Sequence, residues 1–166
     1  MDVSDTQIAE LVERVAHLLQ AREATVATAE SCTGGWIAKA LTDRPGSSDW
    51  FGYGIVTYSN EAKETLLGLA PELIEMHGAV SSEVATQMAV GVRAISDADV
   101  SVAVSGVAGP DGGTDDKPVG TVWLAWKGPG SRAATQLAEF DGDRDSIRRQ
   151  TVVAALNGIL RQLSDG

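Results

Sequence analysis

Short β-prone runs alternate with segments of helical periodicity along most of this sequence, and this alternation limits the folds that the chain can adopt. Residues 100–104 form a short apolar run of the kind that is buried inside a sheet. Apolar residues recur at helical spacing over 5–22, where Ser4 and Gln7 fit a capping box. Helices alternating with strands, followed by a terminal strand pair, predict an α/β fold of three layers, α/β/α. The strand pair makes the expected sheet mixed, mostly parallel, with about five or six strands.

The pattern predicts elements along the whole chain. Strands are expected over 25–30, 54–59, 100–104, 119–126 and 133–140. Helices are expected over 5–22, 36–41, 61–67, 71–76, 81–95 and 143–163. Asn60 is expected to cap the third helix, and residues 127–131 are expected to join the last two strands as a hairpin. No repeat or linker divides the chain, so we predict a single domain over residues 1–166.

Charge and cysteine content exclude several classes of protein. The chain has 13 Lys and Arg against 23 Asp and Glu, a formal net charge of −10, which opposes binding to a nucleic-acid backbone. The single cysteine, Cys32, excludes an intrachain disulfide. No signal peptide is recognisable, and no apolar run approaches the roughly 20 residues that span a bilayer. We therefore expect a cytoplasmic protein that binds neither nucleic acid nor membrane.

Ser31 is the candidate nucleophile. It lies where a predicted strand passes into a Gly-Gly helix start, and open α/β sheets bind ligands at this edge. The amides of Thr33, Gly34 and Gly35 could hold an oxyanion or a phosphate there. Two alternatives remain open: Ser31 could simply cap the helix, and Cys32 could be the nucleophile, because helix N-termini favour thiolates.

Lys63 is the candidate base. The chain has only two histidines, both in positions that suit helix surfaces or ends, and it lacks the Gly-x-Ser-x-Gly pattern. Lys63 falls in the first turn of a helix capped at Asn60, where the helix dipole disfavours an ammonium and burial would lower its pKa. Tyr58, at the end of the preceding strand, could relay a proton or position Ser31. The alternatives are a solvated surface lysine and a half-buried strand tyrosine.

A glycine-rich segment, 105–113, follows the buried strand at the same edge. It matches neither the Walker pattern nor Gly-x-Gly-x-x-Gly, but its amides could contact a phosphate or the oxygen of an amide substrate. Arg144 and Arg148 share a face of the last helix, where a guanidinium could bind phosphate or pair with Asp145. Asp111, Asp115 and Asp116 do not match a calcium loop, so no metal is expected.

Together these motifs resemble the C-terminal domain of the competence/damage-inducible protein CinA. The similarity covers nearly the whole chain and is carried, in order, by residues 29–35, 58–63, 77–81, 105–113, 117–122 and 142–144. The resemblance implies a three-layer α/β/α fold and hydrolysis of nicotinamide mononucleotide to nicotinate mononucleotide and ammonia, in pyridine-nucleotide salvage. Larger family members carry a further N-terminal domain that this sequence lacks, which favours a stand-alone amidohydrolase.

The resemblance also implies roles for particular residues. Ser31 would be the nucleophile, with Lys63 and Tyr58 as the activating group and no cofactor or metal. The residues implied to bind the nucleotide substrate are Thr33, Gly34, Gly35, Ser105, Gly106, Gly109, Gly112, Gly113 and Arg144. Arg144 would contact the phosphate, either within its own subunit or across a subunit boundary. Lys117 is a further candidate for substrate binding. A homodimer or higher homo-oligomer is expected. The alternatives are a hydrolase for another amide, and a module of the same fold that binds a nucleotide or a partner without catalysis.

Overall fold

A five-stranded mixed sheet forms the centre of the computed structural model, which describes residues 2–130 and 132–165. The strands follow the order β2-β1-β3-β4-β5 across the sheet, and their bounds are Val26–Glu30 (β1), Phe51–Val56 (β2), Val100–Gly106 (β3), Thr121–Lys127 (β4) and Ala134–Glu139 (β5). β1 pairs in parallel with β2 and β3, whereas β4 is antiparallel to both β3 and β5. Four strands therefore run in one direction and β4 runs against them.

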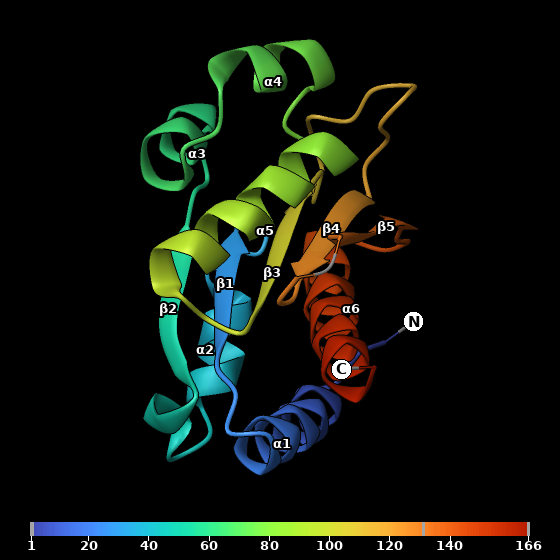
Figure 1. The fold of residues 1–166 in the computed structure, drawn as a ribbon. Helices are drawn as coiled ribbons and strands as arrows, with labels where there is room; N and C mark the ends of the chain where they lie inside the picture. Colours follow the sequence, from blue (N-terminus) through green and yellow to red (C-terminus); the bar gives the residue numbers. More distant parts are fainter. Residues whose placement is uncertain (1, 131, 166) are drawn as a thin grey trace.

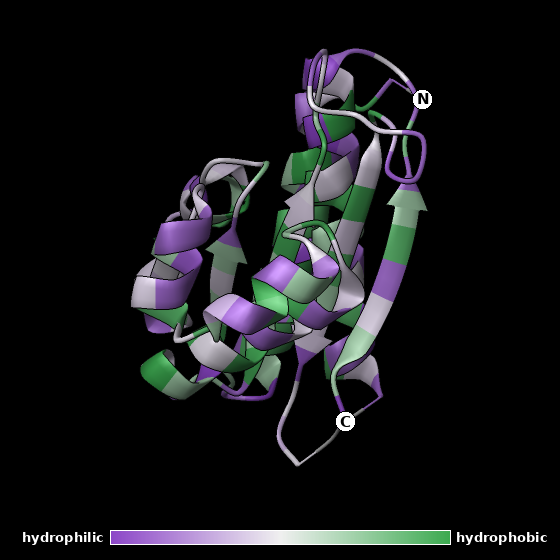
Figure 2. Ribbon diagram, turned by 90° about the horizontal axis from the view of Figure 1, so that it is seen from above, coloured by the Kyte–Doolittle hydropathy of each residue, from purple (hydrophilic) through white to green (hydrophobic). Residues whose placement is uncertain are grey.

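Helices cover both faces of this sheet, which confirms the three-layer α/β/α prediction (Figure 1). Their bounds are Asp5–Ala21 (α1), Trp36–Thr42 (α2), Asn60–Leu67 (α3), Pro71–His77 (α4), Ser82–Ser96 (α5) and Arg144–Ser164 (α6), with a short 3-10 helix at Ser47–Asp49. α5 packs along β1, β3 and β4 on one face, and α6 packs on β3 and β4 from the other face, beside α1. Viewed from above, hydrophobic colours gather in the central strands and hydrophilic colours on outward turns of the helices (Figure 2).

The two faces of the sheet build two separate apolar cores. On β4, Trp126 packs into the core shared with α1 and α6, whereas Trp123 packs against the core under α5, as expected for strand residues of opposite orientation. The Trp126 indole donates to Ala155 O on α6 at 3.0 Å. Gly158 allows this packing, because a Cβ at that position would overlap the Trp126 ring.

Every predicted helix and strand is present, and most differences concern ends. β2 begins at Phe51 and ends at Val56, three residues earlier at each end than expected. The prediction that Asn60 caps α3 is wrong: Ser59 is the cap, its hydroxyl accepts from Ala62 N at 3.0 Å, and Asn60 is the first helical residue. Ser and Asn are about equally favourable as N-cap residues, so the sequence alone does not show which of these two neighbours is the cap. Ser131 of the predicted hairpin turn lies outside the described residues, as do Met1 and Gly166.

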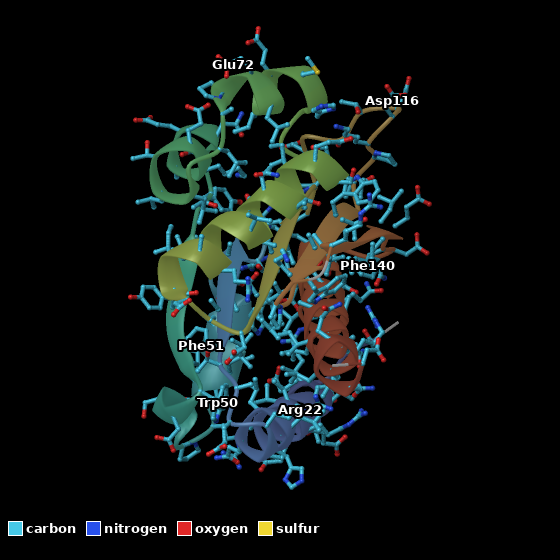
Figure 3. The ribbon with its side chains drawn as sticks, in the orientation of Figure 1. Arg22, Trp50, Phe51, Glu72, Asp116 and Phe140 are labelled. Carbon is cyan, nitrogen blue, oxygen red and sulfur yellow. The ribbon has the colours of Figure 1, made fainter. Side chains whose placement is uncertain are left out.

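The carboxyl ends of β1, β2 and β3 meet at one edge of the sheet, the upper edge in Figure 1. The α3 and α4 helices and the long loop of residues 107–120 gather above this edge. Figure 3 places Glu72 of α4 and Asp116 of the loop at this end, whereas Arg22 and Trp50 lie at the opposite end. Among the described residues, no helix is both long and apolar enough to cross a membrane.

Candidate active site

Ser31 directly follows β1 and begins the turn that leads into α2. Its amide donates to Val104 O of β3 at 3.0 Å, which fixes the backbone of the turn to the neighbouring strand. Ser31 is nearly buried and borders a cavity of about 280 Å³ at the carboxyl edge of the sheet. The position agrees with the edge at which ligands bind to open α/β sheets.

Lys63 reaches the same point from the first turn of α3. Its Nζ lies 3.2 Å from Ser31 Oγ, although the two residues are 32 positions apart in the sequence. The Lys63 side chain is only 1% exposed. This burial lowers the pKa of the Lys63 ammonium, and the nearby Cys32 opposes that effect only in part. The arrangement therefore brings a buried amine of reduced basicity within hydrogen-bonding reach of a hydroxyl.

Backbone carbonyls surround the remaining sides of the Lys63 amine. Nζ donates to Thr57 O at 2.9 Å and lies 3.4 Å from Tyr58 O and 3.5 Å from Ser59 O. A neutral amine has two N–H donors and one lone pair, so two carbonyls can accept from it while the lone pair faces Ser31 Oγ. The same carbonyls can stabilise the third proton when the amine becomes an ammonium.

Tyr58 contributes its carbonyl, rather than its phenol, to this group of atoms. Tyr58 O lies 3.4 Å from both Ser31 Oγ and Lys63 Nζ. The phenol oxygen instead accepts from Arg144 Nη2 at 3.1 Å, and the Tyr58 residue is 58% exposed. Arg144 Nη1 donates to Gly109 O at 2.6 Å, so this arginine joins the start of α6 to the glycine loop across the mouth of the cavity.

The structure divides the other predicted binding residues between two pockets. Ser105, Gly106, Gly109, Gly112 and Arg144 line the cavity beside Ser31 and Lys63. Thr33, Gly34 and Gly35 instead line a second pocket beside Trp36, Arg148 and Arg149. Gly113 lines neither of them; a Cβ there would meet Val119 N at 2.8 Å, so this glycine serves the close packing of the loop.

The backbone amides of Thr33, Gly34 and Gly35 were expected to be free to bind an oxyanion or a phosphate, but groups within this turn already form hydrogen bonds inside the protein. Gly34 N donates to Ser31 O at 3.0 Å, and the Thr33 hydroxyl donates to the Glu30 carboxylate at 2.6 Å. The first amide of α2, Trp36 N, donates to Thr33 O at 3.1 Å, and the next two, Ile37 N and Ala38 N, donate to Glu30. Glu30 therefore occupies the positive end of α2 that the sequence suggested for a substrate.

Sequence reasoning missed several residues at the cavity. Asn60, Ala79 and Val80 line it, the last two from the loop between α4 and α5. The Ser105 hydroxyl donates to Ala79 O at 2.8 Å and joins that loop to β3. Ala79 and Val80 have no reactive side chains, and the signals that could have found them are their place in the 77–81 segment of the family resemblance and their position before a capped helix.

Cys32 has the wrong surroundings for a nucleophile. It is 6% exposed, packs in the core shared with α1 and α6, and also borders the cavity. Burial raises the pKa of the Cys32 thiol to about 12, and the Glu30 carboxylate adds to the increase. The thiolate needed for attack is therefore disfavoured near neutral pH.

Carboxylate, imidazole and thiol groups do not gather into a metal site. Within residues 2–130 and 132–165, no three side chains of His, Cys, Asp or Glu lie together as a potential ligand set. Asp111 lines the cavity without a second carboxylate beside it there.

Comparison with known proteins identifies the family. Residues 8–163 match the family described as the CinA C-terminal domain. The chain is 49% identical to the nicotinamide-nucleotide amidohydrolase PncC of Escherichia coli strain K12, over 96% of this chain and 97% of the relative. It is 56% identical to the protein of the same name from Pseudomonas putida, over 93% and 96%. The solved structure of a competence/damage inducible protein from Agrobacterium tumefaciens superposes with a TM-score of 0.91 at 42% identity, over 99% of this chain and 98% of that chain.

These matches extend over nearly the full length of both partners, and they include the strand, helix and loop segments that form the cavity. This chain belongs to the CinA C-terminal domain family.

Proposed function

We propose that this protein is a nicotinamide-nucleotide amidohydrolase, which converts nicotinamide mononucleotide and water into nicotinate mononucleotide and ammonia in pyridine-nucleotide salvage. The observation that carries the proposal is the 3.2 Å contact between Ser31 Oγ and the buried Lys63 amine at a cavity. The names of the relatives with which the chain shares 49% and 56% identity support the choice of substrate.

In the first step, neutral Lys63 accepts the hydroxyl proton of Ser31 while Ser31 Oγ attacks the carboxamide carbon. The reduced pKa of Lys63 suits this role, because a base must be largely unprotonated to act near neutral pH. The carbonyls of Thr57 and Tyr58 then face the ammonium that forms. They take the place of the carboxylate that supports the histidine in Ser-His-Asp hydrolases.

The tetrahedral intermediate carries a negative oxygen that needs donors. The Cys32 amide is the best-placed candidate, because it directly follows the nucleophile and no oxygen in the described part of the chain accepts from it. Val107 N, by contrast, already donates to Thr121 O at 2.8 Å. One such donor contributes about 3–4 kcal/mol to the transition state in other hydrolases.

The intermediate collapses as the Lys63 ammonium returns its proton to the departing nitrogen, which releases ammonia and leaves an acyl ester on Ser31. A water molecule then attacks the ester while Lys63 accepts one of its protons. Ser31 recovers that proton, and the nicotinate product leaves as a carboxylate once the second proton of the water has passed to solvent.

Arg144 is the group best suited to the phosphate of the nucleotide. It lies at the cavity, and its guanidinium already spans two separate acceptors, Gly109 O and the Tyr58 phenol. A phosphate can replace either acceptor, because the planar fork of arginine matches two phosphate oxygens.

The experiment is an assay of ammonia release from nicotinamide mononucleotide, with free nicotinamide and the intact dinucleotide as comparison substrates. We expect release from the mononucleotide, and a loss of at least about 10³-fold in Ser31→Ala because the nucleophile is removed. Cys32→Ala is the matched control, since it alters the adjacent residue and should stay active. Binding of the mononucleotide without ammonia release would instead support a non-catalytic module, and loss of activity in Cys32→Ala alone would move the nucleophile to Cys32.

A further inference from the structure

The turn of residues 31–35, which carries Ser31, enters α2 without a helix cap of its own. The cap position is Gly35, which has a φ of 99° and offers no side-chain hydrogen bond. The first amides of a helix need acceptors from outside the helix. In α2, Thr33 O accepts from the first amide, Trp36 N, at 3.1 Å. The Glu30 carboxylate at the end of β1 accepts from the next two, Ile37 N at 2.8 Å and Ala38 N at 3.0 Å.

Glu30 holds the middle of the same turn as well. Its carboxylate accepts from the Thr33 hydroxyl at 2.6 Å, and the residue is only 1% exposed. A buried carboxylate is tolerated when hydrogen bonds satisfy it, and such bonds to a charged acceptor are short and strong. One carboxylate is thus bound both to the middle of the turn and to the first turn of α2, which follows it.

Arg148 of α6 also holds the turn. Its Nε donates to Cys32 O at 3.1 Å and its Nη2 to Thr33 O at 3.0 Å. The same guanidinium lies 5.3 Å from the centre of the Trp36 ring, at the first residue of α2. Neither Glu30 nor Arg148 lines the cavity, so neither contacts a substrate bound there.

We propose that Glu30 and Arg148 are positioning residues, which bind residues 31–35 from β1 and from α6 and so hold Ser31 Oγ within proton-transfer reach of Lys63 Nζ. The inference rests on the proposed function, in which Ser31 is the nucleophile. The base is held by a different segment, through the carbonyls of residues 57–59. The contact between nucleophile and base therefore depends on how rigidly each segment is fixed, and a misplacement of about 1 Å can reduce a rate about 100-fold.

Arg149 provides a matched control on the next residue of the same helix. Its guanidinium lies 5.0 Å from the centre of the same Trp36 ring, but it pairs with Asp5 and Asp145 and makes no hydrogen bond to the 31–35 turn. Arg148→Met and Arg149→Met both remove a guanidinium from Trp36. Only Arg148→Met also removes the donors to Cys32 O and Thr33 O.

The test compares the kinetics of these variants on nicotinamide mononucleotide. Arg148→Met and Glu30→Gln should each lower kcat by roughly 10- to 100-fold and change KM by less than about threefold, because the nucleophile is misplaced while the cavity is kept. Arg149→Met should keep the wild-type kcat. Equal kcat in Arg148→Met and Arg149→Met would overturn the proposal, as would a rise in KM without a loss of kcat. Circular dichroism and the thermal midpoint show whether each variant is folded. If Arg148→Met is unfolded, Glu30→Gln and Arg148→Lys are compared with Arg149→Met in its place.

A second readout is independent of the substrate. A small fluorophosphonate should label Ser31 of the wild type, seen as a mass increase of the intact protein, and should label Arg148→Met more slowly by a factor similar to the loss of kcat. If the wild type is labelled but releases no ammonia, the proposed substrate is wrong and the labelling rates still decide whether Arg148 positions Ser31. Equal labelling of Arg148→Met and wild type would overturn the positioning role alone. A wild type that is neither labelled nor active would overturn both proposals.

Discussion

Two walls of the cavity are held in different ways: the turn of residues 31–35, which borders the cavity through Ser31 and Cys32, and the loop of residues 107–120. Buried groups hold the turn: the Glu30 carboxylate, the Thr33 hydroxyl and the pairing of Ser31 N with β3. The loop has an exposed run over residues 110–116, and side chains fasten it mainly at two points, through Arg144 to Gly109 O and through Lys117 to His77 O. This difference suggests that the proposed nucleophile sits on the rigid wall and that the substrate is enclosed by the more adaptable one. Changes at the first wall should therefore alter kcat, and changes at the second should alter KM.

The largest effect is expected from removal of the proposed base, Lys63, which contacts Ser31 on the rigid wall from α3. Lys63→Met keeps a side chain of similar length in a buried position but has no amine, so Ser31 would lack a proton acceptor. We expect kcat to fall by at least about 10³-fold with KM little changed. Lys39→Met, an exposed lysine paired with Asp43 on α2, is the control and should behave as the wild type. An active Lys63→Met would mean that another group activates Ser31.

The pH dependence of the reaction should follow the protonation of Lys63. The base acts when neutral, so kcat/KM should rise with pH and level off above the pKa of Lys63 in the free enzyme. Because burial lowers this pKa, the plateau should begin at a lower pH than it would for a free lysine. Below the pKa, kcat/KM should fall about tenfold for each pH unit. Initial rates between about pH 5 and pH 9 would test this, and a profile without a rising limb would argue against Lys63 as the base.

The local pattern of the sequence predicted where the proposed nucleophile and base lie, but not what surrounds them. A strand that meets a Gly-Gly turn placed Ser31 at the ligand-binding edge, and a helix start placed Lys63 in the first turn of the helix that follows the next strand. The inward orientation of Glu30 was not predictable, because every residue of β1 is buried and no alternation distinguishes its two faces. The role of Arg148 was not predictable either, because Arg144 and Arg148 share a face of the last helix. Only the packing of α6 directs Arg148 to the carbonyls of the turn and Arg144 to the cavity.

A substitution on the loop side should affect binding instead. Arg144→Ala removes the bonds to Gly109 O and to the Tyr58 phenol, together with the proposed phosphate contact. We expect KM for nicotinamide mononucleotide to rise about tenfold or more, as for the loss of a hydrogen bond to a charged group, with a smaller change in kcat. Arg161→Ala, further along α6 and bonded to Gln136, is the control. A loss confined to kcat would place Arg144 with the reacting groups and would remove the distinction between the two walls.

The smallest effect is expected at Lys117, which fastens the loop at a distance from the reacting atoms. Its Nζ donates to His77 O at the end of α4 at 2.9 Å, and it does not line the cavity. Lys117→Met keeps the length of the side chain and removes this bond, so the loop should open more often. We expect KM to rise about two- to fivefold with kcat unchanged, in keeping with the net contribution of one hydrogen bond. Amide hydrogen exchange should become faster in residues 107–120 and stay unchanged in residues 31–35. Faster exchange in both segments, or a loss of kcat, would show that the two walls move together and that the division between a catalytic wall and a binding wall does not hold.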